Sequence, residues 1–554
     1  MPIPRKSTVS SADDLHRFSS FSLCRIRSRM RHFAVLFLPD RPPALAESYE
    51  NSYNAYQMVH PDLECSTGGT PMKQGFHVCS IIRHADRRSR AIGKPWSHPQ
   101  VRNSFPLRAA SLILVLLILL CQLPAGAAHA EPLQDCHKVT NTYTDTTRSN
   151  KAQIRLWQVE TALPAVTEEI NGIASGWVEE LGNFLPDAKN SGKKNSRLDV
   201  EIRYSRTGLR WMSFLVQART TFHQDLTAQR IASRTYDMIS GQRIMLSDLF
   251  NDTAAWSFLA GRVRESLTAY WPDVQPDPEK LNALCERSAL EEAEFTLHGM
   301  SLVLHYPADL LYPDKHTLME VTVFYPEIRD MLAPEAAEQT DNLAYYKTCA
   351  LTFDDGPSSE NTPKVLISLM QTGARGTFFA IGNRVDEYRY LVRREHDNGH
   401  AVASHNWHHG NATKSSAAAL RRMPEKVNNV MIKAIGIPVR YDRVPGGRYP
   451  PMVKAKVKWA YIQWSLDTYD WRGRSADEVL NTVKNQIDDG DIILCHDIKK
   501  NTGEATRKVV QYLEENGYMC LTIDELFAKD GVTFENGKVY YRCKNGDYSI
   551  KKTK

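Results

Sequence analysis

The sequence predicts an α/β protein whose C-terminal half is a parallel sheet of βα units, preceded by a mixed α+β domain. From Lys347 onward, short apolar strands alternate with amphipathic helices, which is typical of βα units that close or stack a parallel sheet. Between Glu131 and about Pro334, strand-like and helix-like segments are mixed, and no repeat is visible. The chain of 554 residues is too long for one hydrophobic core, so several units are expected.

An export signal precedes these two domains. The uncharged apolar run 109–123 follows Arg102 and Arg108 and leads to a small-residue exit that ends at Ala130. The run is shorter than the ~20 residues that a membrane-spanning helix needs. We therefore interpret residues 101–130 as a signal peptide, which predicts an exported protein of the periplasm, cell wall or extracellular space. The alternative is an uncleaved anchor, with membrane contact through this segment only.

Residues 1–100 are rich in Arg, Ser and Pro, and we interpret them as a spurious or disordered leader. The excess of positive charge lies here. Residues 1–110 hold 16 Lys and Arg against 8 Asp and Glu, which leaves 53 against 56 after residue 130. The formal net charge of +5 is therefore no argument for nucleic acid as a partner, and none is predicted.

The domain 131–334 is predicted from hydrophobic spacing. We expect one helix and four strands, at 254–270 and at 198–205, 212–221, 295–306 and 318–325 respectively. Small and polar residues then indicate a linker at 335–346.

The domain 347–529 carries the regular alternation. The expected strands are 349–353, 376–381, 401–403, 460–465, 491–495 and 518–523, with helices near 364–372, from 387, at 414–435, from 476 and at 504–515. Residues 530–554 are a polar, Lys-rich C-terminal tail without an assigned role.

Polar side chains follow these strands at their C-terminal ends, where parallel sheets form their sites. Asp354 and Asp355 end the first strand, and His405 ends the third. Arg443, the segment 467–471 and His496 follow the later strands. Five clusters in equivalent positions predict one constructed site.

The residue types indicate a metal centre. His405 and His409 are spaced i, i+4, and with Asp355 they form a two-His-one-carboxylate set with open positions for water and substrate. Zinc suits these ligands, and iron(II) or another divalent ion is also possible. Two adjacent carboxylates cannot face the same way, so Asp354 stays available as a base, and His496 is a candidate acid.

Each of these features also has a structural interpretation. An Asp pair before Gly-Pro usually makes a turn, and a His-rich stretch is often a surface loop. The segment 467–471 resembles a helix cap with a core Trp, and a single His496 is more often structural. Their joint occurrence favours the functional interpretation.

Five ordered motifs resemble the polysaccharide deacetylase family, the NodB-homology carbohydrate esterases. They are Thr352-Phe-Asp-Asp-Gly-Pro357, Ser404-His-x-x-x-His409, Arg443-x-Pro-x-Gly447, Asp467-x-x-Asp-Trp471 and Leu494-x-His496. The resemblance covers about residues 347–526. It implies a distorted (β/α) barrel of the NodB type and metal-dependent hydrolysis of N-acetyl groups on hexosamine polymers.

The resemblance also implies roles for individual residues. Asp354 would be the general base oriented by Arg443, and His496 the general acid paired with Asp470. The metal, most simply Zn²⁺, would be held by Asp355, His405 and His409, while Trp471 and Leu494 would line the acetyl pocket.

Two positions depart from the family pattern. Asn406 and Gly410 replace the usual Thr and Pro of the second motif, and His408 stands beside His409, although the residue at i+4, His409, fits the ligand position. In the third motif Gly446 stands where an aromatic residue is common. A glycine there still offers its N–H to an oxyanion but removes a ring wall beside the substrate, which predicts a wider cleft.

The preceding domain has a fainter likeness. Segments 241–250, 295–304 and 321–325 resemble an extracytoplasmic domain of unknown function that precedes the deacetylase module in some peptidoglycan deacetylases. The likeness favours peptidoglycan as substrate and a glycan or protein ligand for residues 131–334, with a passive spacer as the alternative.

Three alternatives to a peptidoglycan N-deacetylase remain at this point. The same site suits a chitooligosaccharide deacetylase or an O-acetyl esterase. A wall-binding protein that has lost turnover is the alternative from another class.

Overall fold

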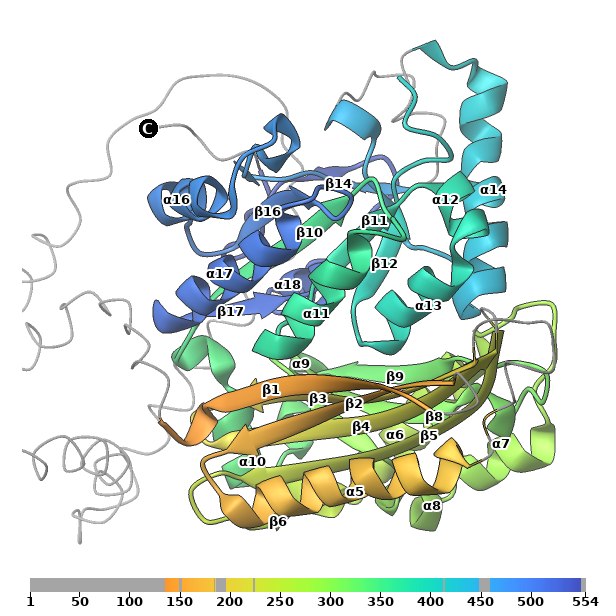
Figure 1. Ribbon diagram of the computed structural model, residues 1–554, viewed down its shortest axis with the longest axis vertical. Coiled ribbons are helices and arrows are strands. Elements are labelled where there is room, and N and C mark those ends of the chain that lie inside the picture. Colours follow the sequence, from red (N-terminus) through yellow and green to blue (C-terminus); the bar gives the residue numbers. More distant parts are fainter. Residues whose placement is uncertain are drawn as a thin grey trace, which may run out of the picture. The chain divides into compact units, whose positions relative to one another are not determined.

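The computed structural model describes residues 135–148, 152–183, 185, 196–222, 225–411, 414–447 and 459–549, which belong to one unit of the chain (Figure 1). The predicted leader 1–100 and the predicted signal segment 101–130 lie outside these residues. Within the described ranges, no helix has the length and apolar character needed to cross a bilayer.

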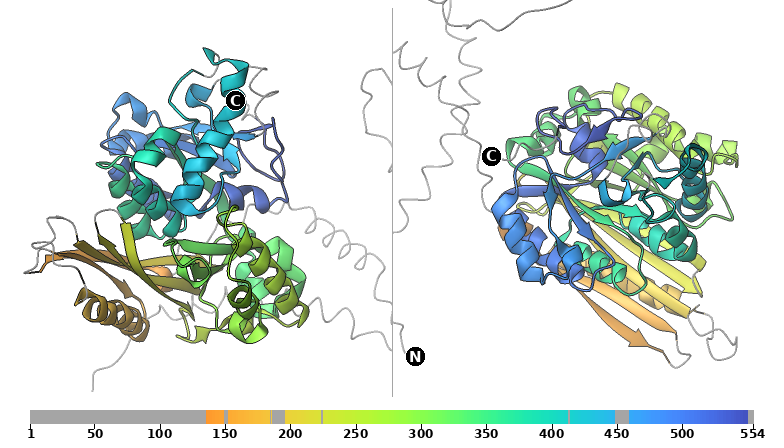
Figure 2. Two further views of the ribbon diagram at one scale, coloured as in Figure 1. Left: turned by 90° about the vertical axis from the view of Figure 1, so that its right-hand side faces the viewer. Right: turned by 90° about the horizontal axis from the view of Figure 1, so that it is seen from above.

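A six-stranded sheet opens the described chain. Its order follows the sequence, and every pair is antiparallel except β2 and β3, which run parallel because α5 connects them. Figure 2 shows α5 along one face of this sheet, where it contacts β2, β3 and β4. The elements are β1 (Val139–Thr147), β2 (Gln153–Thr161), α5 (Pro164–Gly182), β3 (Ser196–Thr207), β4 (Trp211–Phe222), β5 (Asp225–Asp237) and β6 (Arg243–Ile244).

A second, three-stranded antiparallel sheet completes this part. The expected strand 295–306 is a hairpin, because the chain turns where His298 N–H donates to the carbonyl of Ser301. The elements are α6 (Ala254–Thr268), α7 (Pro278–Leu284), α8 (Arg287–Glu291), β7 (Phe295–Leu297), β8 (Ser301–Pro307), β9 (Leu318–Phe324) and α9 (Tyr325–Ile328). Two sheets with separate helices confirm the predicted mixed α+β class.

The predicted linker 335–346 is wrong, because this segment is folded and partly buried. Helix α10 (Pro334–Thr340) begins with a proline at its first turn, and Gln339 is only 4% exposed. Asn342 accepts from Gly208 N–H at 2.8 Å and donates to the carbonyl of Gly299 at 2.7 Å. The polar residues that indicated a linker instead satisfy buried backbone groups.

From Lys347 a parallel sheet with flanking helices forms the predicted distorted (β/α) barrel. Among the described residues this sheet has nine strands: eight follow the order β15-β16-β10-β11-β12-β13-β14-β18, and β17 pairs with β10 off this path. The strands are β10 (Lys347–Asp354), β11 (Thr377–Ala380), β12 (Ala401–Ser404), β13 (Tyr441–Asp442), β14 (Ala460–Ile462), β15 (Leu466–Asp467), β16 (Asp491–His496), β17 (Tyr518–Leu521) and β18 (Val539–Tyr540). The helices are α11 (Thr362–Thr372), α12 (Gly382–Glu387), α13 (Arg389–Asp397), α14 (Ala417–Ile435), α16 (Ala476–Gln486), α17 (Thr502–Glu515) and α18 (Ile523–Ala528).

Strand register aligns the candidate residues at one edge of this sheet. Asp354 of β10 pairs with His496 of β16, and Ser404 of β12 pairs with Asp442 of β13. Because the strands are parallel, the residues that follow them emerge at the same end. The clusters that are separated in sequence therefore meet in space.

The predicted tail 530–554 needs a second correction. Strand β18 pairs with β14, and Tyr540 and Cys543 are 1% and 0% exposed. The Tyr540 ring packs edge-on against Phe527 and Phe534. Apolar and aromatic side chains placed among polar ones therefore add this segment to the barrel, and the boundary at residue 529 is wrong.

Candidate active site

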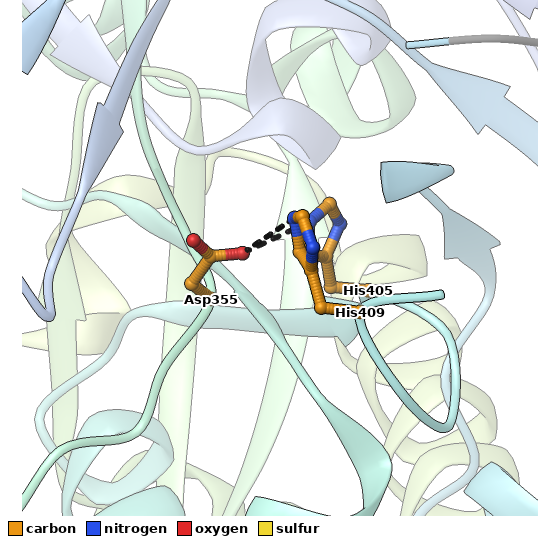
Figure 3. Close-up of side chains that lie close together, drawn as sticks. All are labelled: Asp355, His405 and His409. Atoms are coloured by element: carbon orange, nitrogen blue, oxygen red, sulfur yellow. Dashed lines mark ion pairs between the residues drawn. The ribbon is translucent and has the colours of Figure 1, made fainter. Parts of the chain in front are cut away.

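Three predicted metal ligands converge at the C-terminal edge of the sheet (Figure 3). Oδ1 of Asp355 lies 3.3 Å from Nε2 of His405 and 3.3 Å from Nε2 of His409. Asp355 follows β10 with φ 77°, a backbone conformation that few non-glycine residues adopt. The structure brings His409 to this cluster, and the ring of His408 instead lies edge-on beside Trp407.

The donor set fits a divalent cation. His405 donates Nδ1–H to the carbonyl of Arg443 at 2.6 Å, so Nε2 is the nitrogen that faces the carboxylate of Asp355. Oδ1 of Asp355 is buried and has no hydrogen-bond partner among the described residues. A proton or a metal ion between Nε2 and the carboxylate would satisfy both groups, and two imidazoles with one carboxylate are ligands that suit zinc.

Charge at the cluster favours a cation as well. Burial alone would raise the pKa of Asp355, but His405, His496 and His409 outweigh burial and lower it to about 2. Burial lowers the pKa of His405, whereas Asp354 and Asp355 raise it more, with a net increase. The same carboxylates that hold a proton on His405 would hold a metal ion in its place.

Asp354 lies beside the cluster and is fixed by a buried arginine. Nη1 of Arg443 donates to Oδ1 of Asp354 at 2.7 Å and to Oγ1 of Thr352 at 2.8 Å. Arg443 is fully buried, and its other nitrogens donate to the carbonyls of Ile462 and Gln463. Oδ2 of Asp354 remains 3.8 Å from Nε2 of His405, which directs this oxygen toward the metal ligands.

His496 and Asp470 form the second predicted pair. Nδ1–H of His496 donates to Oδ1 of Asp470 at 2.8 Å, and Oδ2 accepts from the backbone N–H of His496 and from Thr502. Burial lowers the pKa of His496, but Asp470, Asp354 and Asp355 together raise it above its ordinary value. Nε2 is thus left to carry an exchangeable proton.

Strained backbone gathers around this site. Among the described non-glycine residues, positive φ occurs at Asp355, Asn406 and Tyr469, each in a loop that carries a motif, and at two residues elsewhere. The motif glycine Gly356 has a different constraint, because a Cβ there would overlap the carboxylate of Asp497. These loops therefore hold conformations that most residues do not adopt freely.

The three predicted pocket residues differ in exposure. Trp471 is 45% exposed and its indole N–H lies 3.5 Å from Oδ2 of Asp467, whereas Leu494 is 3% exposed. Gly446 is exposed with φ 69°, and a Cβ there would meet no atom within 4 Å. The space beside Gly446 is therefore open at the position where the family commonly has an aromatic side chain.

Two supporting carboxylates were not predicted from the sequence. Asp442 accepts from Ser404 Oγ at 2.6 Å and from Asn406 N–H at 3.1 Å, and burial raises its pKa to about 6. Asp497 is buried, accepts from Thr362, and has its pKa raised by burial to about 7. The sequence signal that could have identified them is their adjacency to predicted site residues, since Asp442 precedes Arg443 and Asp497 follows His496.

Comparisons with known proteins identify the family of the chain. The sequence model of the family described as "Polysaccharide deacetylase" matches residues 344–463. A peptidoglycan-N-acetylglucosamine deacetylase of Bacillus cereus is 34% identical over 188 residues, 32% of this chain and 88% of that protein. The peptidoglycan-N-acetylmuramic acid deacetylase PdaA of Bacillus subtilis is 30% identical over 216 residues. The match covers 36% of this chain and 82% of that protein.

A longer relative is covered only in part. The peptidoglycan-N-acetylglucosamine deacetylase PgdA of Listeria monocytogenes is 38% identical over 195 residues, 35% of this chain. The chain spans 41% of the length of that relative. Among solved structures, a family 4 acetyl xylan esterase from Clostridium thermocellum matches with 30% identity, covering 35% of this chain and 98% of that one, at a TM-score of 0.34.

Proposed function

Because the chain belongs to the polysaccharide deacetylase family, we propose that it is a metal-dependent hydrolase that removes N-acetyl groups from the amino sugars of a cell-wall polysaccharide, namely peptidoglycan. The observation that carries the proposal is the convergence of Asp355, His405 and His409 beside a separately held Asp354. The names of the relatives favour peptidoglycan over chitin. An exported location follows from this substrate and from the signal segment.

The metal ligands would be Asp355, His405 and His409. A divalent cation bound there, most simply Zn²⁺, would polarise the acetyl carbonyl and acidify the attacking water. Asp354 takes the proton of that water, because Arg443 occupies its Oδ1 and leaves Oδ2 on the side of the ligands. His405 keeps its orientation through the carbonyl of Arg443, so one arginine supports both the base and a ligand.

The leaving amine needs a proton, and His496 supplies it from Nε2. Asp470 holds the ring through Nδ1 and stabilises its protonated form. Negative charge on the acetyl oxygen is met by the backbone N–H of Gly446 in the third motif. Trp471 provides an exposed aromatic wall for the substrate.

The decisive experiment is incubation of the purified protein with bacterial wall, with chitin oligomers and with an O-acetylated sugar. Acetate release and the mass of the resulting sugar identify the bond and the residue that are attacked. From bacterial wall we expect acetate together with muramic acid or glucosamine residues that carry a free amine in place of the N-acetyl group. Equal or faster release from the O-acetyl ester would favour an esterase, and no release from any substrate would favour a wall-binding protein.

Asp470→Asn should change the pH dependence of catalysis. A general acid works only while protonated, so the raised pKa of His496 extends activity toward higher pH. Without the carboxylate this pKa falls, the alkaline limb of kcat/KM should move to lower pH, and the rate at neutral pH should fall about 10²-fold. The exposed Asp477→Asn is the control, and an unmoved alkaline limb would argue against His496 as the acid.

Gly446→Tyr should change the preference between sugars. Its φ of 69° costs an L-residue about 1–2 kcal/mol, but no described atom lies within 4 Å of a Cβ placed there, and the N–H remains. We expect the ratio of kcat/KM for muramic acid and glucosamine sites to shift. Gly531→Tyr, with φ 65° and equally open surroundings, is the matched control. An unchanged ratio would remove Gly446 from the determinants of specificity.

A further inference from the structure

Two cysteines face each other on neighbouring strands of the barrel. Cys349 of β10 and Cys520 of β17 are directly opposite in the parallel register (strands labelled in Figure 1). Their sulfurs lie 3.9 Å apart. Both side chains point to the same face of the sheet, because Cys349 belongs to an apolar cluster with Leu351 and Tyr518, and Cys520 packs against that cluster.

The backbone at this pair suits a disulfide. A disulfide joins residues whose Cα atoms are about 4.4–6.8 Å apart. Neighbouring strands of a sheet lie about 4.8 Å apart, which falls in this range. Because the strands already have the required separation, only the two side chains must turn to bring the sulfurs to a bond length of about 2 Å.

The sulfurs of two other buried cysteines are engaged differently. Sγ of Cys495 accepts from Oγ1 of Thr468 at 3.7 Å, and Sγ of Cys543 donates to Oδ2 of Asp530 at 3.3 Å. These two thiols contact oxygen atoms, whereas the thiols of Cys349 and Cys520 contact each other. The register and the sulfur contact therefore select one pair.

We propose that Cys349 and Cys520 form a disulfide in the exported protein, which makes this pair a covalent cross-link site of the barrel. Disulfides form and persist in oxidising compartments, so the proposal rests on the proposed export. Cys520 is half-buried and Cys349 is fully buried, so Cys520 meets the oxidant first.

The oxidant is a second disulfide, of a small molecule or a protein, and the reaction is an exchange. The thiolate of Cys520 attacks one sulfur of the oxidant, which forms a mixed disulfide and expels one thiolate. Cys349 then loses its proton to that thiolate and attacks Sγ of Cys520, which expels the second thiolate. Two cysteine thiols become one cystine, and the oxidant is reduced to two thiols.

The cross-link would enclose the whole candidate site. The two cysteines are 171 positions apart in sequence, and every predicted site residue from Asp354 to His496 lies between them. A bond that closes such a long loop restricts the unfolded chain and thereby stabilises the folded one. The register that it joins is already present, so the expected effect is on stability and not on turnover.

The test is made on the purified full chain. The protein is incubated with oxidised glutathione, the remaining thiols are alkylated in denaturant, and the digest is analysed by mass spectrometry. We expect one cross-linked peptide pair that contains Cys349 and Cys520, two hydrogens lighter than the two thiol peptides together. Cys495 and Cys543 should carry the alkyl group.

Thermal melts measure the consequence of the link. A phosphine reductant should lower the Tm of the oxidised protein by about 5–10 °C. Cys349→Ala cannot form the link, so its Tm should not respond to the reductant. Cys543→Ala is the matched control, because it also removes a fully buried thiol, and it should keep the full response.

Alkylation of both Cys349 and Cys520 after incubation with the oxidant would overturn the proposal, as would an undiminished response of Cys349→Ala to the reductant. The peptide analysis uses the unaltered chain, so it decides the matter even where a variant fails to fold. If the linked protein releases no acetate from any substrate, the proposed catalysis fails and the cross-link stands. Acetate release by a protein whose two cysteines are both alkylated has the opposite meaning.

Discussion

Asp354→Asn should retain metal and lose turnover by about 10²- to 10⁴-fold, the usual contribution of a positioned base. Asparagine keeps an oxygen that accepts from Nη1 of Arg443, so the geometry around the arginine can persist. The asparagine amide, unlike the carboxylate of Asp354, cannot take a proton from the attacking water. The three ligands are unchanged, and metal content should stay near that of the original protein.

The measurement combines acetate release from wall with metal content by elemental analysis. Asp386→Asn, an exposed acid on α12 that pairs with Arg389, is the control for loss of one carboxylate. A thermal melt checks that the buried charge of Arg443, now unmatched, has not unfolded the protein. Turnover within a few-fold of the original with metal retained would mean that Asp354 is not the base.

His405→Ala should lose the metal and with it essentially all activity. Its imidazole is 2% exposed in its side chain and held by the carbonyl of Arg443, so no neighbouring side chain can replace Nε2. Treatment of the original protein with a chelator should reproduce the loss, and added Zn²⁺ should restore the original protein but not the variant.

The adjacent histidines give an internal control for this experiment. His409→Ala should weaken metal binding, to a smaller degree because its side chain is 55% exposed and less firmly held. His408→Ala removes a neighbouring imidazole outside the ligand group and should bind metal normally. Full acetate release by the chelated protein, or metal loss in His408→Ala only, would contradict the assigned ligands.

The site residues could be predicted from the sequence where polar side chains directly follow a strand that hydrophobic periodicity reveals. Asp354, Asp355, His405 and His496 stand at the ends of apolar strands, and parallel register brings such ends together whatever the loops between them do. The i, i+4 spacing predicted His409 rather than His408, although the backbone there is a loop and not a helix.

Polar segments with tertiary roles could not be recognised from the sequence alone. Gln339 and Asn342 have the composition of a linker, yet they are buried because their amides meet backbone groups distant in the chain. Asp442 and Asp497 support the site through partners from other strands and helices, a relation that spacing along the chain does not encode. Local patterns fix an element's type more readily than its partners.

Strand β18 has a consequence for any fragment of this protein. A piece that stopped near residue 529 would contain all five motifs and yet leave β14 with a row of unpaired amide and carbonyl groups. Phe527 would lose its ring contacts with Phe534 and Tyr540. Because of this unpaired strand edge and exposed apolar surface, such a fragment would tend to self-associate. A shortened version intended for crystallisation should therefore end beyond Lys544.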